Sequence, residues 1–316
     1  MEIAPNIHSI PVIFFDTRIV TCHLLIGETH SLLIDTAMKD SPKQDLLPYM
    51  QKIGFDPARL TYILITHSDI DHQEGNDAMK AAAPQALFMC HNLDRPWVES
   101  MQALESGRYR QWYEYGIGQK PEPPPYKPNV RMDLTFEGGE TIRLGPDWVV
   151  EIVHTPGHTW GHSGVYDPKS KTFIAGESAL WNAILDKDWQ PALPPTYCYV
   201  DTYMASIERL RAMDIETYSG AHWPVMHGND IGAFLDESKS YALIVEQILL
   251  NTIRRLERGV GMKELIQLLK PDLGTWPANQ DEAMVYPLNG NLRRLEDRGL
   301  ITRSRGKDGT FEWTAQ

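Results

Sequence analysis

The residues best suited to chemistry lie in one short stretch of the chain, residues 66–72, which reads THSDIDH. Imidazole and carboxylate groups are ligands for Zn, Mn and Fe. The apolar run directly before it, residues 62–65, is typical of a buried parallel strand. Ligands bind at the carboxyl ends of strands in an open α/β sheet, so the stretch lies where a metal site would form. Its ligand-type side chains are His67, Asp69, Asp71 and His72.

A polar strand-to-helix turn with capping aspartates explains that stretch as well as a metal site does, but three later signals favour the metal site. The motif His154-Thr-Pro-Gly-His158 follows a predicted strand, and its Pro-Gly turn directs His158 back across the strand ends. Glu177 follows the apolar strand 172–175, and His222 follows the strand 216–219. Four strand ends that each carry a ligand-type side chain are difficult to explain by packing.

These strands belong to a pattern that predicts an α/β fold. Short apolar strands fill the first forty residues, and strands and helices then alternate up to about residue 235. Residues 92–130 break the alternation with aromatic residues among charged ones and end in a proline-rich segment, 121–125, that predicts a stiff connector. This insertion is interpreted as a helical subdomain that packs on the core or as a lid over the site, and the two interpretations are compatible.

The last part of the chain has a different organisation. Predicted helices at 261–269 and 288–298 precede a hairpin that turns through Gly306–Gly309, which is the element order of a winged helix. Acidic residues prevail before about residue 245 and are nearly balanced by basic ones after it. We therefore predict two domains, 1–235 and 236–316. The candidate phosphate contacts of the second are Arg293, Arg294, Arg303, Arg305 and Lys307, although a packing or dimerisation module with a solvated basic face is favoured.

Composition narrows the functional classes. The net charge of −12 over 316 residues argues against a surface built for nucleic acid. There is no pattern of a signal peptide, and no apolar run reaches the ~18 residues of a membrane span, so the expected location is cytoplasmic. The three cysteines are widely spaced and odd in number, which fits neither a disulfide framework nor a cysteine-based zinc site. A small-molecule substrate and a homodimer are the expected partners.

The order of the motifs resembles that of the metallo-β-lactamase superfamily. The resemblance covers roughly residues 10–230 and rests on residues 33–36 (LIDT), 66–72, 154–161, Gly176-Glu177 and His222. It implies an αββα sandwich with two divalent metal ions at one edge of its sheets. It also implies His67, Asp69 and His158 as ligands of the first metal, Asp71, His72 and His222 as ligands of the second, and Glu177 as the bridging carboxylate.

Two positions depart from the pattern of that superfamily. Its common signature is H-x-H-x-D-H, in which Asp69 here replaces the second histidine, and Glu177 replaces an aspartate. Oxygen-rich ligand sets shift preference from Zn toward Fe or Mn. A carboxylate at position 69 resembles the diiron flavoprotein reductases of oxygen and nitric oxide, although this chain has no recognisable flavin-binding region. A third interpretation is that the two changes leave one metal site empty.

The leading functional hypothesis is hydrolysis of a small ester, lactone or phosphoester by a water that two metal ions activate. Asp71 is the expected catalytic residue, because its carboxylate can hold the nucleophile or relay a proton. Alternatives are a diiron oxidoreductase or O2/NO sensor, a DNA-binding regulator and, from a resemblance to ribonucleases of the same superfamily, a nuclease. The predicted substrate contacts are His162 and the aromatic residues Trp97, Trp112, Tyr113, Trp181 and Trp189.

Overall fold

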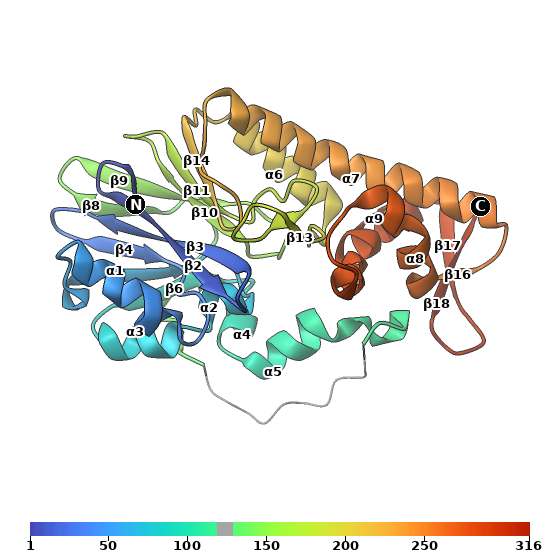
Figure 1. Ribbon diagram of the computed structural model, residues 1–316, viewed down its shortest axis with the longest axis horizontal. Coiled ribbons are helices and arrows are strands. Elements are labelled where there is room, and N and C mark those ends of the chain that lie inside the picture. Colours follow the sequence, from blue (N-terminus) through green and yellow to red (C-terminus); the bar gives the residue numbers. More distant parts are fainter. Residues whose placement is uncertain (119–128) are drawn as a thin grey trace.

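Two β-sheets form the centre of the molecule in the computed structural model, which describes residues 1–118 and 129–316 (Figure 1). The first sheet has seven strands in chain order, antiparallel from β1 to β4 and parallel from β4 to β7. They are β1 (Glu2–Ala4), β2 (Ile7–Phe14), β3 (Arg18–Ile26), β4 (Ser31–Ile34), β5 (Tyr62–Ile65), β6 (Leu87–His91) and β7 (Leu134–Phe136).

The second sheet has six strands in the order β15-β14-β11-β10-β9-β8. They are β8 (Thr141–Gly145), β9 (Trp148–His154), β10 (Ser163–Asp167), β11 (Thr172–Gly176), β14 (Thr217–Gly220) and β15 (Met226–His227). Apolar side chains of both sheets, such as Leu64 and Ile152, share one buried cluster. The sheets therefore pack face to face because each buries one apolar face against the other.

Helices cover the two outer faces and complete four layers. On the first sheet lie η1 (Pro42–Leu46), α1 (Leu47–Lys52), η2 (Pro57–Arg59), α2 (Ile70–Gln73) and α3 (Asn76–Ala82). On the second lie α6 (Val200–Ala212) and the long helix α7 (Asn229–Leu256). A small hairpin, β12 (Ile184–Leu185) and β13 (Pro191–Leu193), lies between the second sheet and the C-terminal elements. The predicted αββα sandwich is confirmed.

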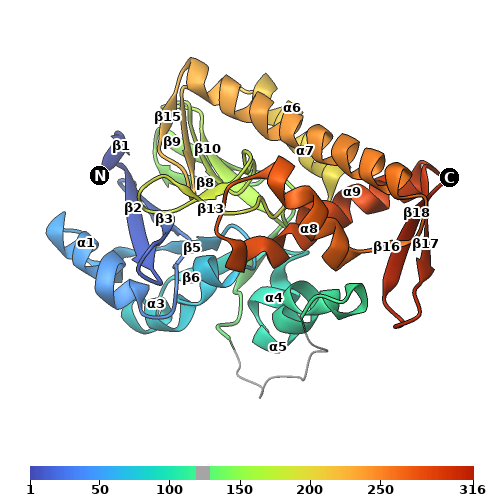
Figure 2. The ribbon, with the colours of Figure 1, turned by 45° about the vertical axis from the view of Figure 1, so that its right-hand side comes forward.

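The insertion is helical and bridges the sandwich and the end of the chain. It consists of α4 (Arg95–Val98), α5 (Met101–Leu104), η3 (Glu105–Tyr109) and η4 (Gln111–Tyr115). Trp112 lies edge-on against Tyr286, and Tyr115 stacks on Trp313, so the insertion packs against the C-terminal elements (Figure 2). The predicted stiff connector at 121–125 lies outside the described residues.

The C-terminal elements follow the predicted order of two helices and a hairpin. They are β16 (Val260–Gly261), α8 (Met262–Leu273), η5 (Ala278–Met284), α9 (Val285–Asp297), β17 (Ile301–Arg305) and β18 (Phe311–Ala315). The predicted boundary between residues 235 and 236 falls inside the continuous helix α7. One buried cluster extends from Val153 to Trp313, so these elements share a core with the second sheet. A winged-helix-like domain as such stays a prediction.

The basic residues of this region are largely engaged in ion pairs. Arg294 binds Asp201 and Glu246, and Arg305 lies 2.6 Å from the carboxylate of Glu114. The helix α9 buries most of one side against α6 and α7. These contacts favour the packing interpretation over a DNA-binding one. No helix in the described parts of the chain is long and apolar enough to span a membrane.

Candidate metal centre

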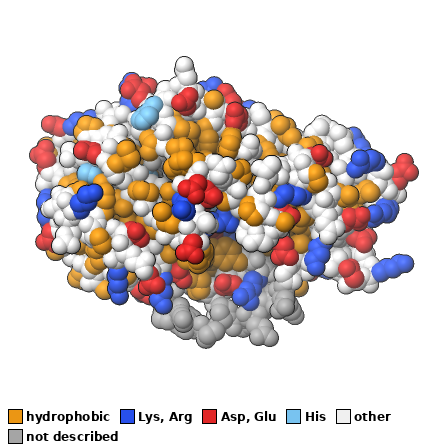
Figure 3. Space-filling model, viewed as in Figure 1, with side chains coloured by type: hydrophobic (Ala, Val, Ile, Leu, Met, Phe, Trp, Pro, Cys, Tyr) orange, Lys and Arg blue, Asp and Glu red, His pale blue; other side chains and the backbone are white. Residues whose placement is uncertain are grey.

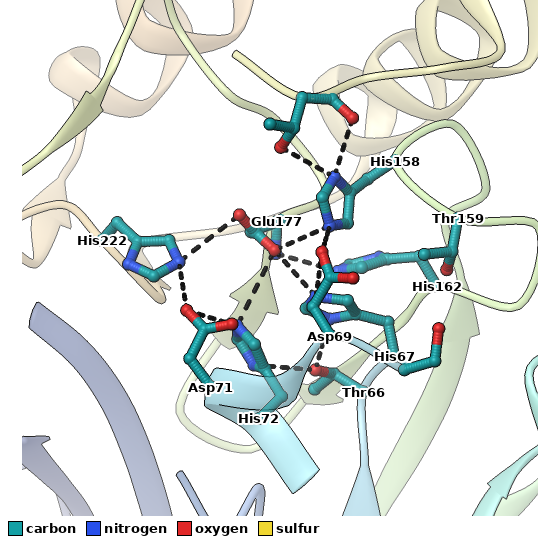
Figure 4. A network of polar contacts seen from close by, with 12 residues as sticks. Thr66, His67, Asp69, Asp71, His72, His158, Thr159, His162, Glu177 and His222 are labelled. Atoms are coloured by element: carbon teal, nitrogen blue, oxygen red, sulfur yellow. Dashed lines mark hydrogen bonds and ion pairs between the residues drawn. The ribbon is translucent and has the colours of Figure 1, made fainter. Parts of the chain in front are cut away.

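All seven predicted metal ligands converge at one edge of the two sheets (Figure 4). Each follows a strand of the sandwich, so the backbone hydrogen bonds of the sheets fix where each side chain begins. Residues 67 and 69 lie in the turn after β5, and residues 71 and 72 lie in α2. His158, Glu177 and His222 follow β9, β11 and β14. The seven side chains thus lie together as expected, because strands that run in the same direction end at a common edge.

The carboxylate of Glu177 lies at the centre of this cluster. Its Oε2 is 2.8 Å from His67 Nε2, 2.9 Å from His158 Nε2 and 3.7 Å from His72 Nε2. Its other oxygen, Oε1, is 3.4 Å from His222 Nε2. One carboxylate thus faces imidazoles from both predicted metal sites, which is the arrangement that a bridging ligand requires.

The four imidazoles present their Nε2 atoms to the cluster because oxygen acceptors hold their Nδ1 atoms. His72 Nδ1 donates to Asp35 Oδ2 at 2.8 Å, and His158 Nδ1 donates to the Thr196 carbonyl at 3.1 Å. His222 Nδ1 donates to the carbonyl of Ile19. His67 Nδ1 donates to the Thr66 hydroxyl, which itself donates to Asp35. When the imidazole ring is neutral, its proton is therefore on Nδ1 and its Nε2 carries a lone pair that can bind a metal ion. Metal-binding histidines commonly have such partners at the other ring nitrogen.

The donor set fits divalent cations. His67 Nε2 and His72 Nε2 are buried, and neither has a hydrogen-bond partner among the described residues. Carboxylate oxygens lie near both atoms, but not in the geometry of a hydrogen bond. Buried polar atoms are seldom left without a partner unless a site for water or an ion explains them. The candidate ligand atoms form two groups, and the atoms of each group lie within 4.8 Å of one another. The first group is His67, Asp69, His158 and Glu177, and the second is Asp71, His72 and His222.

The negative charge of the carboxylates in the cluster also favours the binding of cations. Burial lowers the pKa of His72, but Asp35 and Asp71 outweigh it and raise that pKa to about 10. Burial likewise lowers the pKa of His158, but Glu177 outweighs it and raises that pKa to about 9. In the absence of metal, protons on these imidazoles balance the carboxylates. A divalent cation replaces such protons when it binds.

Arg108 of the insertion is a site residue that the sequence did not reveal. Its guanidinium is buried and forms a two-pronged ion pair with Asp69, in which Nη2 lies 2.7 Å from Oδ2. The same Nη2 is 2.9 Å from His158 Nε2, and Tyr109 donates to Asp69 Oδ1 at 3.0 Å. Burial raises the pKa of Asp69, but Arg108 outweighs it and holds that pKa well below its usual range. No motif surrounds this arginine, so only the folded chain shows its role.

Asp94 is a second residue that the sequence did not indicate. It is buried, and its Oδ2 accepts hydrogen bonds from Ser68 N at 3.1 Å and from the Thr159 hydroxyl at 2.7 Å. Its Oδ1 accepts one from Gly161 N at 2.8 Å. A side chain at position 161 would meet Asp94, which explains the glycine there. Asp94 therefore ties the two ligand-bearing loops of His67 and His158 to each other.

His162 has a positioning role in place of the predicted contact with substrate. It is fully buried, its Nδ1 lies 2.9 Å from the Thr155 hydroxyl, and its Nε2 accepts a hydrogen bond from Glu177 N at 2.8 Å. Burial, with His67 and His158 nearby, lowers the pKa of His162 well below its usual range, so the ring stays neutral. The ring thus fixes the backbone that carries the central carboxylate.

A cavity of about 830 Å³ opens onto the cluster at Asp69, Asp71 and Glu177. Its walls come from the β2–β3 hairpin, the β12–β13 hairpin and η5. Figure 3 shows a hollow on this face with hydrophobic side chains in its depth. The cavity gives a substrate of small-molecule size access to the ligand cluster.

None of the five aromatic residues predicted as substrate contacts lines this cavity. Trp112 is buried against Tyr286 of the C-terminal elements, and Trp97 packs against Gly107 within the insertion. Tyr113 and Trp189 are 38% and 42% exposed on the surface, and the Trp181 indole donates to Glu237. The aromatic side chains that do line the cavity are Phe14, Phe15, Tyr109 and Tyr286.

Comparisons with known proteins agree with this geometry. Curated relatives include an uncharacterized protein YobT of Bacillus subtilis (strain 168), 27% identical over 50% of this chain and 61% of its own length. An N-acyl homoserine lactonase of a Bacillus species is 24% identical over 46% of this chain and 57% of its own length. A hydroxyacylglutathione hydrolase of Mesorhizobium japonicum is 27% identical over 45% of this chain and 42% of its own length. The matches thus span about half of each relative.

A solved structure shares the whole fold. A metallo-beta-lactamase family protein from Thermus thermophilus superposes over 100% of both chains with a TM-score of 0.76 and 19% identity. The sequence model of the metallo-beta-lactamase superfamily matches residues 15–222, which include all seven ligands of the cluster. This chain belongs to the metallo-beta-lactamase superfamily.

Proposed function

We propose that this chain is a dinuclear metal-dependent hydrolase of small carboxylic esters or lactones. The observation that carries the proposal is the convergence of four imidazole Nε2 atoms on the carboxylate of Glu177. His67, Asp69 and His158 would hold one cation, Asp71, His72 and His222 would hold the other, and Glu177 would bridge them. Bound there, two divalent cations would lower the pKa of a water and polarise a carbonyl oxygen.

Asp71 is the residue of the cluster best placed to move a proton. Its side chain is 20% exposed and lines the cavity, and its Oδ2 lies 3.6 Å from His222 Nε2. A carboxylate in this position takes the proton of the attacking water and returns it to the oxygen of the leaving alcohol. For a lactone the same step opens the ring, and the acid and alcohol remain in one molecule.

The choice of ester and lactone over larger substrates follows from the cavity. Its volume is within the range of about 300–1,000 Å³ that small-molecule sites occupy. Two of the relatives are named as an N-acyl homoserine lactonase and a hydroxyacylglutathione hydrolase, and both names describe hydrolysis of a small acyl compound. Both considerations support hydrolysis of a small substrate.

The ion pair of Asp69 bears on the iron-based alternative. That alternative rests on the additional negative charge that a carboxylate at position 69 brings to the ligand set. Arg108 and Tyr109 engage both oxygens of Asp69, and the positive charge of Arg108 compensates the negative one. The net charge of the first ligand group is therefore close to that of a group with a neutral imidazole at this position, which favours hydrolysis over redox chemistry.

The test is removal and replacement of metal. We expect dialysis against a chelator to abolish hydrolysis of a small ester such as 4-nitrophenyl acetate and of a small lactone. Restoring Zn, Mn or Fe in separate samples should recover the rate with at least one of these ions. Equal ester and lactone turnover before and after complete metal removal would contradict the proposal, as would oxygen or nitric oxide reduction by an iron-loaded protein without hydrolysis.

A further inference from the structure

Arg18 is a basic residue in the cavity wall whose side chain has no ion pair with any described residue. It is the first residue of β3, its backbone pairs with Phe14 across the hairpin, and it forms a bridge with Asp186 beside β12. Its side chain lines the cavity together with the metal-ligand candidates Asp69 and Asp71. The arginine is therefore fixed at its backbone, and it borders the same cavity as the ligand cluster.

The guanidinium of Arg18 has a buried nitrogen without a hydrogen-bond acceptor among the described residues. Its Nη1 atom is buried, and among the described residues it has no hydrogen-bond partner. Asp71 and Asp186 are the acidic neighbours of Arg18, but no described carboxylate lies within ion-pair distance of it. Asp186 Oδ1 accepts hydrogen bonds from Asp188 N and Gln190 N of its own loop. A buried donor of a charged group that is left unpaired costs free energy, so an acceptor from a ligand would relieve it.

The other arginine of the cavity provides the contrast. Arg108 donates to both oxygens of Asp69 and to the His158 carbonyl, and its guanidinium lies over the ring of Tyr286. Its charge and its donors are satisfied by the protein. Arg18 is thus the arginine of this cavity whose donors remain available for a ligand.

Apart from Thr17 and Asp186, the wall near Arg18 is largely apolar. Phe14 and Phe15 at the tip of the β2–β3 hairpin lie on one side, and Ile184, Leu185, Pro191 and Leu193 of the β12–β13 hairpin lie on the other. The side chain of Phe15 is 71% exposed, so this wall extends to the mouth of the cavity. The surface suits an apolar chain or ring that bears one charged group.

We propose that Arg18 forms an anion subsite, and that the preferred substrate is an amphipathic ester or lactone with a carboxylate or a similar anionic group. The inference rests on the proposed function for the position of the ester at the metal ligands. The apolar part of the substrate lies between the two hairpins, and its anion pairs with the guanidinium of Arg18. Two cations at the cluster would outweigh its three carboxylates, so the whole cavity would attract an anionic molecule.

The kinetic test compares two esters of matched length, mono-4-nitrophenyl glutarate, which ends in a carboxylate, and 4-nitrophenyl pentanoate, which ends in a methyl group. In Arg18→Met we expect kcat/KM for the glutarate ester to fall about 10- to 100-fold, the range for loss of a charge-assisted hydrogen bond. The rate with the pentanoate ester should stay within about twofold. Arg18→Lys should retain part of the preference, because it keeps the charge and loses the planar fork.

Arg143→Met is the matched control, because Arg143 is exposed on β8 and outside the cavity, and its loss changes the net charge equally. It should leave both rates unchanged. Equal losses for both esters in Arg18→Met, or a glutarate preference that survives in that variant, would overturn the inference.

A binding measurement separates this inference from the proposed function. By calorimetry, 4-phenylbutanoate should bind the metal-loaded protein about tenfold more tightly than the neutral 4-phenylbutanamide, and Arg18→Met should abolish that difference. If the protein hydrolyses neither ester and this difference still depends on Arg18, the hydrolase proposal fails and the anion subsite stands. If neither compound binds, or both bind equally to the wild-type protein, the anion subsite is disproved.

Discussion

The two groups of candidate metal ligands differ in the hydrogen bonds that their aspartates receive. Asp69, in the first group, receives hydrogen bonds from Arg108 and Tyr109 on both of its oxygens. Asp71, in the second group, lies only two residues later, lines the cavity and is held by no described hydrogen-bond donor of this kind. Two aspartates only two residues apart in the chain therefore have different environments.

The difference arises from the insertion. Arg108 and Tyr109 lie at its η3 segment and reach the first group, whereas the second group is bordered by the β2–β3 hairpin and the cavity. The comparison teaches that the aspartate of the first group is fixed and charge-compensated by the insertion, whereas the aspartate of the second group, which lines the same cavity, is free of such contacts with the described residues. The predictions below test this division.

The largest expected effect is that of Asp71→Asn. Loss of the proton-carrying carboxylate should lower kcat of ester hydrolysis by about 10²- to 10⁴-fold, the usual contribution of a general base. Steady-state kinetics and metal analysis of the same samples measure it. The metal at the first group should remain bound, and a variant with wild-type kcat would show that Asp71 does not carry the proton.

The next effect is on stability. Asp69→Ala removes one partner of a buried ion pair and leaves Arg108, whose side chain is 2% exposed, without its counter-charge. We expect the free energy of unfolding of the metal-free protein to fall by about 3–5 kcal/mol. Urea unfolding of Asp69→Ala, Arg108→Met and the double variant forms a cycle, in which the double variant should lose less than the sum of the single ones. Simple additivity would mean that the pair is not coupled.

A smaller effect is expected on metal affinity. Arg108→Met removes a positive charge that contacts both Asp69 and His158, so the first cation should bind at least about tenfold more tightly. Competition with a fluorescent chelator measures this affinity. Arg110→Met is the control, because Arg110 is a half-exposed neighbour whose partner is Glu105 on the surface. Equal affinities in all three proteins would show that Arg108 does not act on the metal.

The smallest effect is expected for the aromatic residues that the sequence had suggested as substrate contacts. Tyr113→Ala and Trp189→Ala should change KM by less than about twofold, because both side chains are on the surface and outside the cavity. Phe14→Ala, in the cavity wall, is the comparison and should raise KM several-fold. A large KM change in Tyr113→Ala and none in Phe14→Ala would contradict the position of the cavity.

The cluster of candidate ligands was predictable from sequence because its members lie in the segments that follow strand ends, and short-range patterns locate strand ends well. His67, His158, Glu177 and His222 all met this rule. The αββα layers followed from the same strands and from the resemblance to the superfamily. The candidate ligands and the layers of the fold could be predicted because they depend on residues that are close in the chain and on the common edge of parallel strands.

The residues that the sequence missed depend on contacts between distant segments. Arg108 reaches Asp69 across 39 positions of the chain, and Asp94 reaches Gly161 across 67. The cavity wall joins Phe14 to Leu193 and Tyr286. The helix α7 continues through the predicted domain boundary, with apolar residues that pack on both the second sheet and the C-terminal elements. None of these contacts leaves a local pattern.

The most direct measurement of the central claim is an anomalous-scattering map of the crystallised protein, recorded at the absorption edge of the metal that the purified protein contains. We expect two peaks, one among His67, Asp69 and His158 and one among Asp71, His72 and His222, on either side of the Glu177 carboxylate. A map of metal-supplemented crystals with no peak in this cluster, or with peaks only elsewhere, would contradict the account.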